Sequence, residues 1–471
     1  MAKYLFIRRV LKLGLLWGCN FLAQAQSPTA IPTADPIATT WADMTVRVMT
    51  KAPRNTPTYG SRAIGYLGLT MYETVVYASA SHRSVFRRLA GADLLPKPDP
   101  QKEYCWELSL NAGQAYMLKA LYAYTKKGQL IDSLEGALRQ RYVNRVSPEV
   151  AERSERFGQA VATAIYEWSK TDGGHEGYER NFPTDYVRPT GEGLWIPPII
   201  GQSNTKIPMH PTWGQNRTFS ARNGKLPLPK PLVYSTDTTS QYYSQYKEVF
   251  DRGKTLTTAD RATVMWWGDD PTETCSPPGH SYNLATIAIR TSQADVVKAA
   301  ETYARVGMAV ADAFVCCWKV KFTFMVQRPS SFIQNNLATS RSWGPPWLPF
   351  FLEPPFPSFY SGHAVQSAAT ATVLTDLYGD TFAFTDNTHV NRPDYFYTYL
   401  STAPDKSTYS YPQLIEHLLK YEARHYQSFW EAARECAESR LMGGIHTRHD
   451  NEVGLAEGTK IGRNINSFRW H

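Results

Sequence analysis

Residues 294–329 read ADVVKAAETYARVGMAVADAFVCCWKVKFTFMVQRP and form the longest helical pattern of the chain. Apolar residues recur at three- and four-residue spacing up to about Phe324, which predicts one long helix. Lys321 and Arg328 stand seven residues apart, so both would lie on one face of it, and Pro329 would end it. By itself such a basic pair is most often a solvated helix face.

Helical patterns flank this segment on both sides. They cover 62–79, 103–126, 132–145, 150–169, 240–252, 257–267, 281–292, 364–378 and 412–442. The fourth has Ser147 as its N-cap and Pro148 at its first helical position. Because convincing alternating strands are absent, the sequence predicts an all-α fold of two packed helical bundles.

Two long stretches rich in proline interrupt the helices. They run from about 171 to 240 and from Pro329 to Pro357, and the second contains Trp343 and Trp347. Stretches of this length usually cover a surface or shape a pocket mouth. We therefore expect an N-terminal region, 26–240, that opens with a linker to about residue 40, and a C-terminal helical bundle, 241–471, that carries the functional site.

The first 25 residues have the features of a signal peptide. Four basic residues precede an apolar run from Leu13 to Leu22, and AQA at 23–25 is a small-residue cleavage site. The run has roughly half the length of a spanning helix, and no later segment is apolar enough to span a bilayer. Export to the periplasm or the exterior is expected; the alternatives are an N-terminal membrane anchor and lipid attachment at Cys19.

The charge of the chain argues against a nucleic-acid partner. Loss of the first 25 residues lowers the formal net charge from +8 to +4, which is mild for this length. The remaining cysteines match no zinc or redox motif; they are Cys105, Cys275, Cys316, Cys317 and Cys436. The last three fall in helical patterns and are expected to be buried small hydrophobes. Disulfide pairing and oligomeric state stay open at this stage.

A second segment, PSFYSGH at 357–363, precedes the small-residue helix predicted at 364–378. A Ser-Gly pair that opens a helix directs a hydroxyl and backbone N–H groups toward an anion, with the helix dipole in support. Ser361 and Gly362 would provide these donors, and His363 would stand beside the anion. The alternative is that Ser361 is only an N-cap and His363 a satisfied polar residue.

A third segment, SRLMGGIHTRHD at 439–450, adds Arg440, His446 and Asp450. Asp450 follows His446 by four residues, and at this spacing on a helix a carboxylate can hold one imidazole nitrogen. The other nitrogen is then left basic enough to be a nucleophile or a ligand. Gly443 and Gly444 would weaken a plain helix, so they indicate a close approach of the backbone to another group.

Taken in order, the three segments resemble the signature of the superfamily that unites vanadium-dependent haloperoxidases with type 2 phosphatidic-acid-phosphatase-like acid phosphatases. The pattern is Lys-x6-Arg-Pro, Ser-Gly-His and Ser-Arg-x5-His-x3-Asp, and it spans 321–450. The all-α bundles of that superfamily agree with the helical prediction. One departure is Tyr360, which stands where proline is usual, so the loop loses a fixed backbone angle and gains a phenol.

The resemblance implies a vanadate cofactor whose metal has His446 as its one protein ligand. The vanadate oxygens would be held by Lys321, Arg328, Ser361, Gly362 and Arg440, with His363 handling protons. Hydrogen peroxide, polarised by Lys321, would then oxidise a halide to hypohalous acid, while the metal acts as a Lewis acid without redox change. In a phosphatase of the same superfamily, His446 would instead form a phosphohistidine and His363 would protonate the leaving alcohol.

Two aromatic residues favour the haloperoxidase. Trp318 lies three residues before Lys321 and Phe356 lies five before Ser361, the spacings at which haloperoxidases have aromatics that line the halide site. With Tyr360 they form the expected halide pocket, whose apolar wall suits a weakly hydrated anion. Iodide or bromide is favoured over chloride. A non-catalytic oxyanion-binding protein is the third possibility, but it would not need His363 and Asp450.

The segment WWGDD at 266–270 is dense in aromatic and acidic residues. We expect it to form a wall behind the anion site, in which Asp269 orients Arg440. The alternative is a turn with N-capping aspartates.

Overall fold

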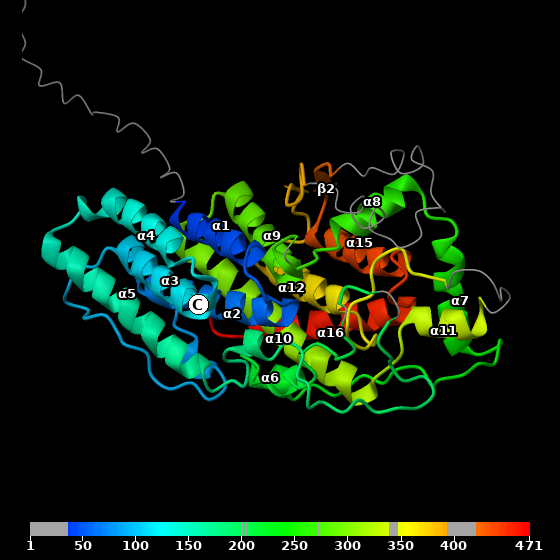
Figure 1. Cartoon of the computed structure of the whole chain (residues 1–471). Helices are drawn as coiled ribbons and strands as arrows, with labels where there is room; N and C mark the ends of the chain where they lie inside the picture. The colour runs from blue at the N-terminus through cyan, green and yellow to red at the C-terminus, as the bar shows by residue number, and fades with distance from the viewer. Residues whose placement is uncertain (1–35, 199–200, 204, 272, 339–346, 393–420) are drawn as a thin grey trace, which may run out of the picture. The chain divides into compact units, whose positions relative to one another are not determined.

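The computed structural model describes residues 36–198, 201–203, 205–271, 273–338, 347–392 and 421–471. The predicted signal peptide, Cys19 and Trp343 lie outside these residues. By their contacts the described residues form one unit, built almost entirely of helices (Figure 1). The all-α class is therefore confirmed, and the boundary near residue 240 stays a prediction.

The N-terminal half contains five α-helices: α1 Ile37–Thr50, α2 Pro57–Val75, α3 Trp106–Leu121, α4 Gly128–Val143 and α5 Pro148–Ser169. The start of α5 is as predicted, since the Ser147 side chain accepts a hydrogen bond from the Val150 N–H and Pro148 begins the helix. The predicted linker is wrong from Ile37 onward. Residues 37–50 form an amphipathic helix, which the many Thr and Ala residues at its start made hard to recognise in the sequence. Its apolar face, which includes Trp41 and Val48, is buried.

The C-terminal half contains the helices α6 Ala221–Gly224, α7 Gln241–Gly253, α8 Thr258–Trp266, α9 Ser276–Ser292, α10 Val296–Phe324, α11 Pro329–Asn336, α12 Gly362–Tyr378, α15 Phe429–Met442 and α16 Arg448–Asn466. Short 3-10 turns occupy Val76–Ala78, Phe86–Arg88, Ala123–Thr125, Gly177–Glu179 and Trp213–Gln215. Helices α11 and α16 were not predicted, because α11 is short and lies in a stretch that its prolines marked as loop.

The prediction that strands are absent is wrong in one place. Strand β1 (Phe384–Asp386) pairs antiparallel with β2 (Arg424–Tyr426), with Phe384 opposite Tyr426. Of the helix predicted at 412–442, residues 412–420 lie outside the described ranges, and α15 begins only at Phe429. Three-residue strands are too short to show an alternating pattern in the sequence.

Helix α10 confirms the long helix but ends before Arg328. Met325 follows it in the left-handed conformation, with φ of 50°, and its N–H donates to the Lys321 carbonyl. Arg328 is the N-cap of α11, so the prediction that Lys321 and Arg328 share a helix face is wrong. Pro329 begins α11 rather than ending α10, because proline is well tolerated at a first helical position.

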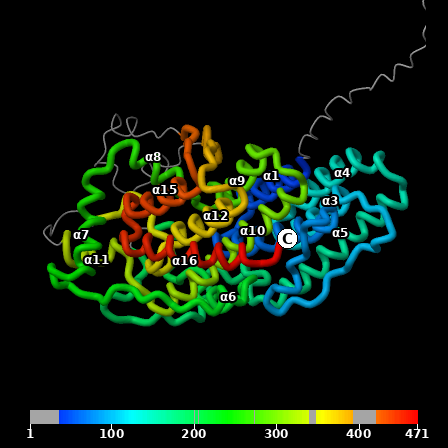
Figure 2. The backbone as a smooth tube through the Cα atoms, turned by 180° about the vertical axis from the view of Figure 1, so that it is seen from behind, coloured from blue at the N-terminus to red at the C-terminus, as the bar shows by residue number. Residues whose placement is uncertain are grey.

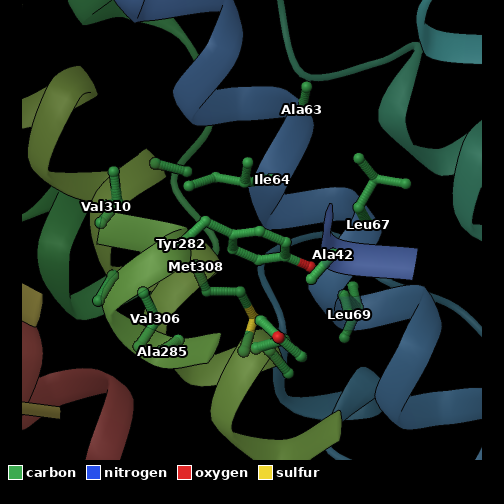
Figure 3. Close-up of a cluster of buried hydrophobic side chains, with 14 of the residues drawn as sticks. Ala42, Ala63, Ile64, Leu67, Leu69, Tyr282, Ala285, Val306, Met308 and Val310 are labelled. Atoms are coloured by element: carbon green, nitrogen blue, oxygen red, sulfur yellow. The ribbon is translucent and has the colours of Figure 1, made fainter. Parts of the chain in front are cut away.

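Helix α10 packs against α2 in the centre of the core. A Cβ added to Gly307 would lie 2.3 Å from the Ile64 carbonyl oxygen, and one at Gly68 would lie 2.3 Å from that of Tyr303. Only glycine lets the two backbones approach so closely. Figure 3 shows the apolar side chains beside this contact, contributed by α1, α2, α9 and α10: Ala42, Ile64, Leu67, Tyr282, Val306, Met308 and Val310.

Helix α12 contacts α10, α15 and α16, and it lies beside α15 and α16 in both views (Figures 1 and 2). A Cβ added to Gly458 of α16 would lie 2.2 Å from the Val365 carbonyl oxygen of α12, so these two helices also pack backbone to backbone. This packing gathers the end of α10, the start of α12 and the loop after α15.

The described helices include none that is long and apolar enough to cross a membrane. All five cysteines that the structure describes are free thiols, and Cys317 and Cys436 are fully buried as predicted, while Cys316 is partly buried.

Candidate functional site

The three predicted segments meet around a cavity of about 690 Å³. Its wall includes Trp318, Phe351, Phe356, Gly362, His363, Ile445 and His446. Lys321, Arg328, Ser361 and Arg440 are fully buried next to these residues. Residues more than a hundred positions apart in the sequence thus converge on one site, as the motif pattern predicted.

Lys321 reaches the site from the last turn of α10. Its Nζ donates to the carbonyl oxygens of Pro357, at 2.9 Å, and Ser358, at 2.6 Å, and it lies 5.3 Å from the centre of the Phe356 ring. Burial lowers the pKa of Lys321 to about 7. The amino group is held in place by neutral carbonyl groups, and an anion that arrives beside it favours its protonated form.

Arg328 and Arg440 are also held by uncharged oxygen atoms. Arg328 donates from Nε to the Phe356 carbonyl and from Nη1 to the Ile445 carbonyl, while Arg440 donates from Nε to Ser439 Oγ and from Nη2 to the Val264 carbonyl. Each guanidinium stands over an aromatic ring, Phe356 or Phe351. Burial lowers the pKa of Arg328 to about 10 and also lowers that of Arg440.

These three cations lack the counter-charges that buried cations normally have. Among the ion pairs of the described residues, none includes Lys321, Arg328 or Arg440. Arg328 Nη2 and Arg440 Nη1 are buried without a hydrogen-bond partner in the part of the chain that the structure describes. Buried charge without a partner is costly, so the arrangement favours a bound anion.

The Ser-Gly pair opens α12 as predicted. Ser361 is the N-cap, its Oγ accepts from the Ala364 N–H at 3.3 Å, and Gly362 is the first helical residue. The N-cap role of Ser361 is therefore confirmed, and the anion-binding role of the pair stays a prediction. The N–H groups at this helix start contribute partial positive charge at the cavity wall.

His363 is the second residue of α12, and its Nε2 is buried without a partner among the described residues. Burial, followed by the charge of Arg440, lowers the pKa of His363 to about 3. The imidazole is therefore neutral at ordinary pH and can accept a proton at Nε2 only when negative charge enters the cavity.

His446 lies in the loop between α15 and α16 rather than on a helix, so that part of its prediction is wrong. Its contact with Asp450 is nevertheless as predicted: Nδ1 lies 3.0 Å from Asp450 Oδ2, because Thr447 caps α16 and places Asp450 in the first turn. Nε2 lies 3.1 Å from Arg328 Nη1.

The protonation of this pair follows from its environment. Burial opposes ionisation of Asp450, but hydrogen bonds with His446 and Ser358 hold its pKa at about 2. Burial and the charge of Arg328 hold the pKa of His446 well below its ordinary range. An ionised Asp450 can only accept, so Nδ1 of the neutral imidazole donates, and Nε2 keeps its lone pair.

Ser358 is a site residue that the sequence reasoning did not identify. Its Oγ donates to Asp450 Oδ2 at 2.5 Å and lies 3.3 Å from His446 Nδ1, while its carbonyl accepts from Lys321. One residue thus links the cation at the end of α10 to the imidazole. Its position three residues before Ser361, inside the second motif, was the available signal.

The aromatic predictions hold for two residues of three. Trp318 and Phe356 line the cavity with ring centres 4.8 Å apart. Tyr360 is buried but lines a neighbouring cavity of about 480 Å³, together with Trp318 and Glu457, so its placement in the halide pocket is wrong. The reason is that the chain turns at Ser361 to begin α12, which leaves the residue before it on the far side of the wall.

Asp269 lines the cavity, but its partners are two histidines rather than Arg440. Its carboxylate oxygens lie 2.8 Å from His280 Nδ1 and 2.7 Å from His389 Nε2, and His280 Nε2 reaches Asp386 at 2.8 Å. The predicted orienting contact is therefore replaced by this network. Asp269 still acts on Arg440 and His363 through its charge.

Comparison with known proteins gives consistent results. Residues 301–469 match the family model described as the VCPO second helical-bundle domain. A vanadium chloroperoxidase from Curvularia inaequalis is 26% identical over 353 residues, which cover 62% of this chain and 56% of that protein. The match thus spans little more than half of the relative's length.

Two solved structures are similar over nearly the whole chain. The structure titled as the first bacterial vanadium-dependent iodoperoxidase has a TM-score of 0.74 and 26% identity, and the match covers 92% of this chain and 96% of that one. A holo-type bacterial vanadium-dependent chloroperoxidase has a TM-score of 0.65 at 15% identity, with 89% and 92% covered, which is a likeness in fold. The helical architecture and the motif resemblance are confirmed together.

Proposed function

We propose that this chain, which has the fold of the vanadium-dependent haloperoxidases and a match to their second helical bundle, is itself a vanadate-dependent haloperoxidase. One observation carries the proposal. Lys321, Arg328 and Arg440 are buried around a cavity that His446 lines, and no carboxylate pairs with any of them within the described residues. A site with this surplus of buried cationic side chains is suited to an oxyanion.

The donor set fits vanadate. Oxygen atoms of the anion would be held by Lys321, Arg328, Arg440, the Ser361 hydroxyl and the Gly362 N–H, with His363 beside them. Arg328, Arg440 and His363 each have one buried nitrogen without a partner among the described residues, which the anion would satisfy. The lone pair on His446 Nε2 suits a transition metal, and Asp450 fixes the tautomer that presents it.

Bound vanadate would supply a Lewis acid that activates hydrogen peroxide for attack by a halide. The guanidinium groups and Lys321 stabilise the negative charge of the anion without moving, because carbonyl and hydroxyl groups already hold them. His363 Nε2 accepts a proton released at the site, since its pKa of about 3 rises beside negative charge.

The halide would approach along the wall formed by Trp318 and Phe356. Two buried aromatic rings exclude water and favour a large, weakly hydrated anion, so iodide or bromide is proposed over chloride. The likeness to a bacterial iodoperoxidase supports this choice. The N-terminal sequence supports export to the periplasm or the exterior as the setting of the reaction.

The proposal is tested with purified protein incubated with vanadate, peroxide and each halide in turn, beside a phosphate-ester assay without vanadate. We expect halide oxidation that depends on vanadate and is fastest with iodide or bromide. Ester hydrolysis without halide oxidation would assign the chain to the acid phosphatases. Vanadate or phosphate binding with neither activity would favour an oxyanion-binding protein.

Asp450→Asn is expected to weaken vanadate binding about 10- to 100-fold, the usual effect of losing the residue that orients a metal-bound histidine. The amide can still contact His446 Nδ1 but offers no negative charge to favour the Nε2 tautomer. Equilibrium dialysis with vanadate measures the change. Asp380→Asn, at an exposed position just after α12, is the matched control. An unchanged affinity for Asp450→Asn would contradict the role of Asp450.

Vanadate binding is expected to take up a proton at Lys321. In the unfolded chain this lysine stays protonated up to about pH 10.4, but in the folded protein only up to about pH 7. The unfolded state binds more protons between these values, so without vanadate Lys321 makes the free energy of unfolding rise with pH from about 7 to about 10. A bound anion favours the charged form and reverses this effect.

Calorimetric titration with vanadate at pH 8, in two buffers of different ionisation enthalpy, measures the uptake. Wild type is expected to take up close to one proton more than Lys321→Met, and peroxide turnover is expected to fall in that variant. Lys319→Met, exposed on the same helix, should match wild type. Equal uptake by wild type and Lys321→Met would show that the lysine is already charged.

A further inference from the structure

A second group of potential ligands surrounds Glu301, near the N-terminal end of α10. The Glu301 side chain is fully buried. His82 Nε2 lies 3.5 Å from Glu301 Oε2, and His471 Nε2 lies 3.5 Å from Glu301 Oε1. The two imidazole rings have centres 4.6 Å apart, and three ligand atoms from distant parts of the chain lie within 4.8 Å of one another.

Two of these atoms lack a hydrogen-bond partner. His82 Nε2 and Glu301 Oε2 are buried and make no hydrogen bond to any residue that the structure describes. The other ring nitrogen of His82, Nδ1, lies 2.7 Å from Ser79 Oγ. A histidine fixed through one nitrogen, with the other aimed at a carboxylate that it does not reach, has the arrangement of a metal ligand.

The spacing of the atoms also fits a metal. A nitrogen and an oxygen 3.5 Å apart are too far apart for a good hydrogen bond. Two ligands of a tetrahedral zinc ion, with bonds of about 2.0–2.1 Å, are separated by roughly 3.3–3.5 Å. We propose that His82, Glu301 and His471 form a binding site for a divalent transition-metal cation of the zinc type, with water completing the coordination.

Two neighbouring cations must be accommodated. Lys298 Nζ lies 3.6 Å from Glu301 Oε2, and its side chain is 30% exposed, so it can turn toward solvent when a metal takes that oxygen. Arg305 donates to Glu301 Oε1 and also to Asp376 Oδ2 at 2.8 Å. It therefore keeps a carboxylate partner whether or not a metal is bound. The metal would therefore use Oε2, which has no hydrogen bond within the described residues, and the 55% exposed His471 side chain, now 3.5 Å from Oε1, would turn toward it.

The chain around His471 is already fixed. Trp470 is buried, and its carbonyl accepts from the Arg83 N–H at 2.8 Å and from the Tyr72 hydroxyl at 3.3 Å. The last residues therefore lie against the segment after α2, where both views place the chain end (Figures 1 and 2). A metal here would fasten residues 470–471 to that segment and to α10.

The site is independent of the proposed haloperoxidase function. Glu301 and Lys321 lie twenty residues apart on α10, which is about 30 Å along the helix axis. The two sites can therefore be tested separately, and failure of one leaves the other standing.

The experiment uses untagged full-length protein stripped with a chelator and titrated with Zn²⁺ by calorimetry, and with Co²⁺ by visible absorption. We expect one equivalent of each, cobalt bands of a four-coordinate site, and a higher unfolding temperature with Zn²⁺. His82→Ala and His471→Ala should lose the binding, and Ser79→Ala should weaken it about tenfold. His175→Ala is the matched control, since His175 Nε2 lies 3.8 Å from Glu176 in a partly exposed pair.

Three outcomes would overturn the proposal. They are a wild type that binds no Zn²⁺, a His471→Ala variant that binds like wild type, and binding that is lost only in His446→Ala, which would place the metal in the other site. The His471 side chain is 55% exposed, so its truncation should leave the fold intact even where His82→Ala does not.

Discussion

His446→Ala is expected to abolish vanadate binding and, with it, halide oxidation. The imidazole is the residue proposed to bond the metal; its Nδ1 is held 3.0 Å from Asp450, and its Nε2 lies 3.1 Å from Arg328 Nη1 at the site. Alanine removes the ligand and leaves only the cationic side chains, which attract an oxyanion but do not bond to vanadium. The loss of vanadate affinity should exceed the 10- to 100-fold effect that is typical when a residue that only orients a metal ligand, such as Asp450, is removed.

Equilibrium dialysis with vanadate and the halide assay measure this result, and circular dichroism checks that the variant is folded. Some loss of stability is expected, about 1–3 kcal/mol, because Asp450 keeps Ser358 but loses its imidazole partner. His425→Ala, at an exposed position on β2, should behave as wild type. Halide oxidation at the wild-type rate by His446→Ala would refute the assignment of the metal ligand.

Arg440→Met is expected to lower vanadate affinity about 100-fold. The guanidinium has one buried nitrogen left for the anion, and a hydrogen bond between charged groups contributes about 1.5–3 kcal/mol, which is roughly 10- to 150-fold in affinity. The exposed Arg434, on the same helix, provides the control Arg434→Met. Lysine should not substitute for Arg440, because it lacks the planar fork that also bonds Ser439 and Val264.

Without vanadate, Arg440→Met should not destabilise the protein, although it weakens vanadate binding. Burial lowers the pKa of Arg440, so its charge opposes folding, and no carboxylate of the described residues pairs with it. Methionine fills much of the volume without the charge. We expect the unliganded variant to unfold at a temperature equal to or above that of wild type, with wild type the more stable at saturating vanadate. A lower unfolding temperature in both conditions would mean that Arg440 is mainly structural.

The proposed function explains why such a costly arrangement is present. A protein that only needed a stable core would pair or replace the three buried cations. Here they are fixed by carbonyl and hydroxyl groups, which hold their positions without neutralising their charge. In the unliganded site these cations have no paired carboxylate among the described residues. A bound anion would supply the negative charge, and this gain would favour binding.

Sequence alone determined the features that depend on near neighbours. The long helix up to Phe324, the Ser147-Pro148 start of α5 and the Ser361 cap of α12 were all predicted, because helical periodicity and capping are set within a few residues. The contact between His446 and Asp450 was also predicted, but from a helix that does not include His446; the Thr447 cap of α16 places Asp450 beside it instead. The motif residues themselves were found through their order and spacing along the chain.

Only the tertiary structure decided what surrounds those residues. The left-handed turn at Met325 moved Arg328 onto a separate helix, and the start of α12 left Tyr360 facing a different cavity. Asp269 contacts His389, which is 120 residues away in the sequence, rather than Arg440. Sequence spacing carries no information on such contacts, because the cost of burying a charge depends on every group that folding brings near it.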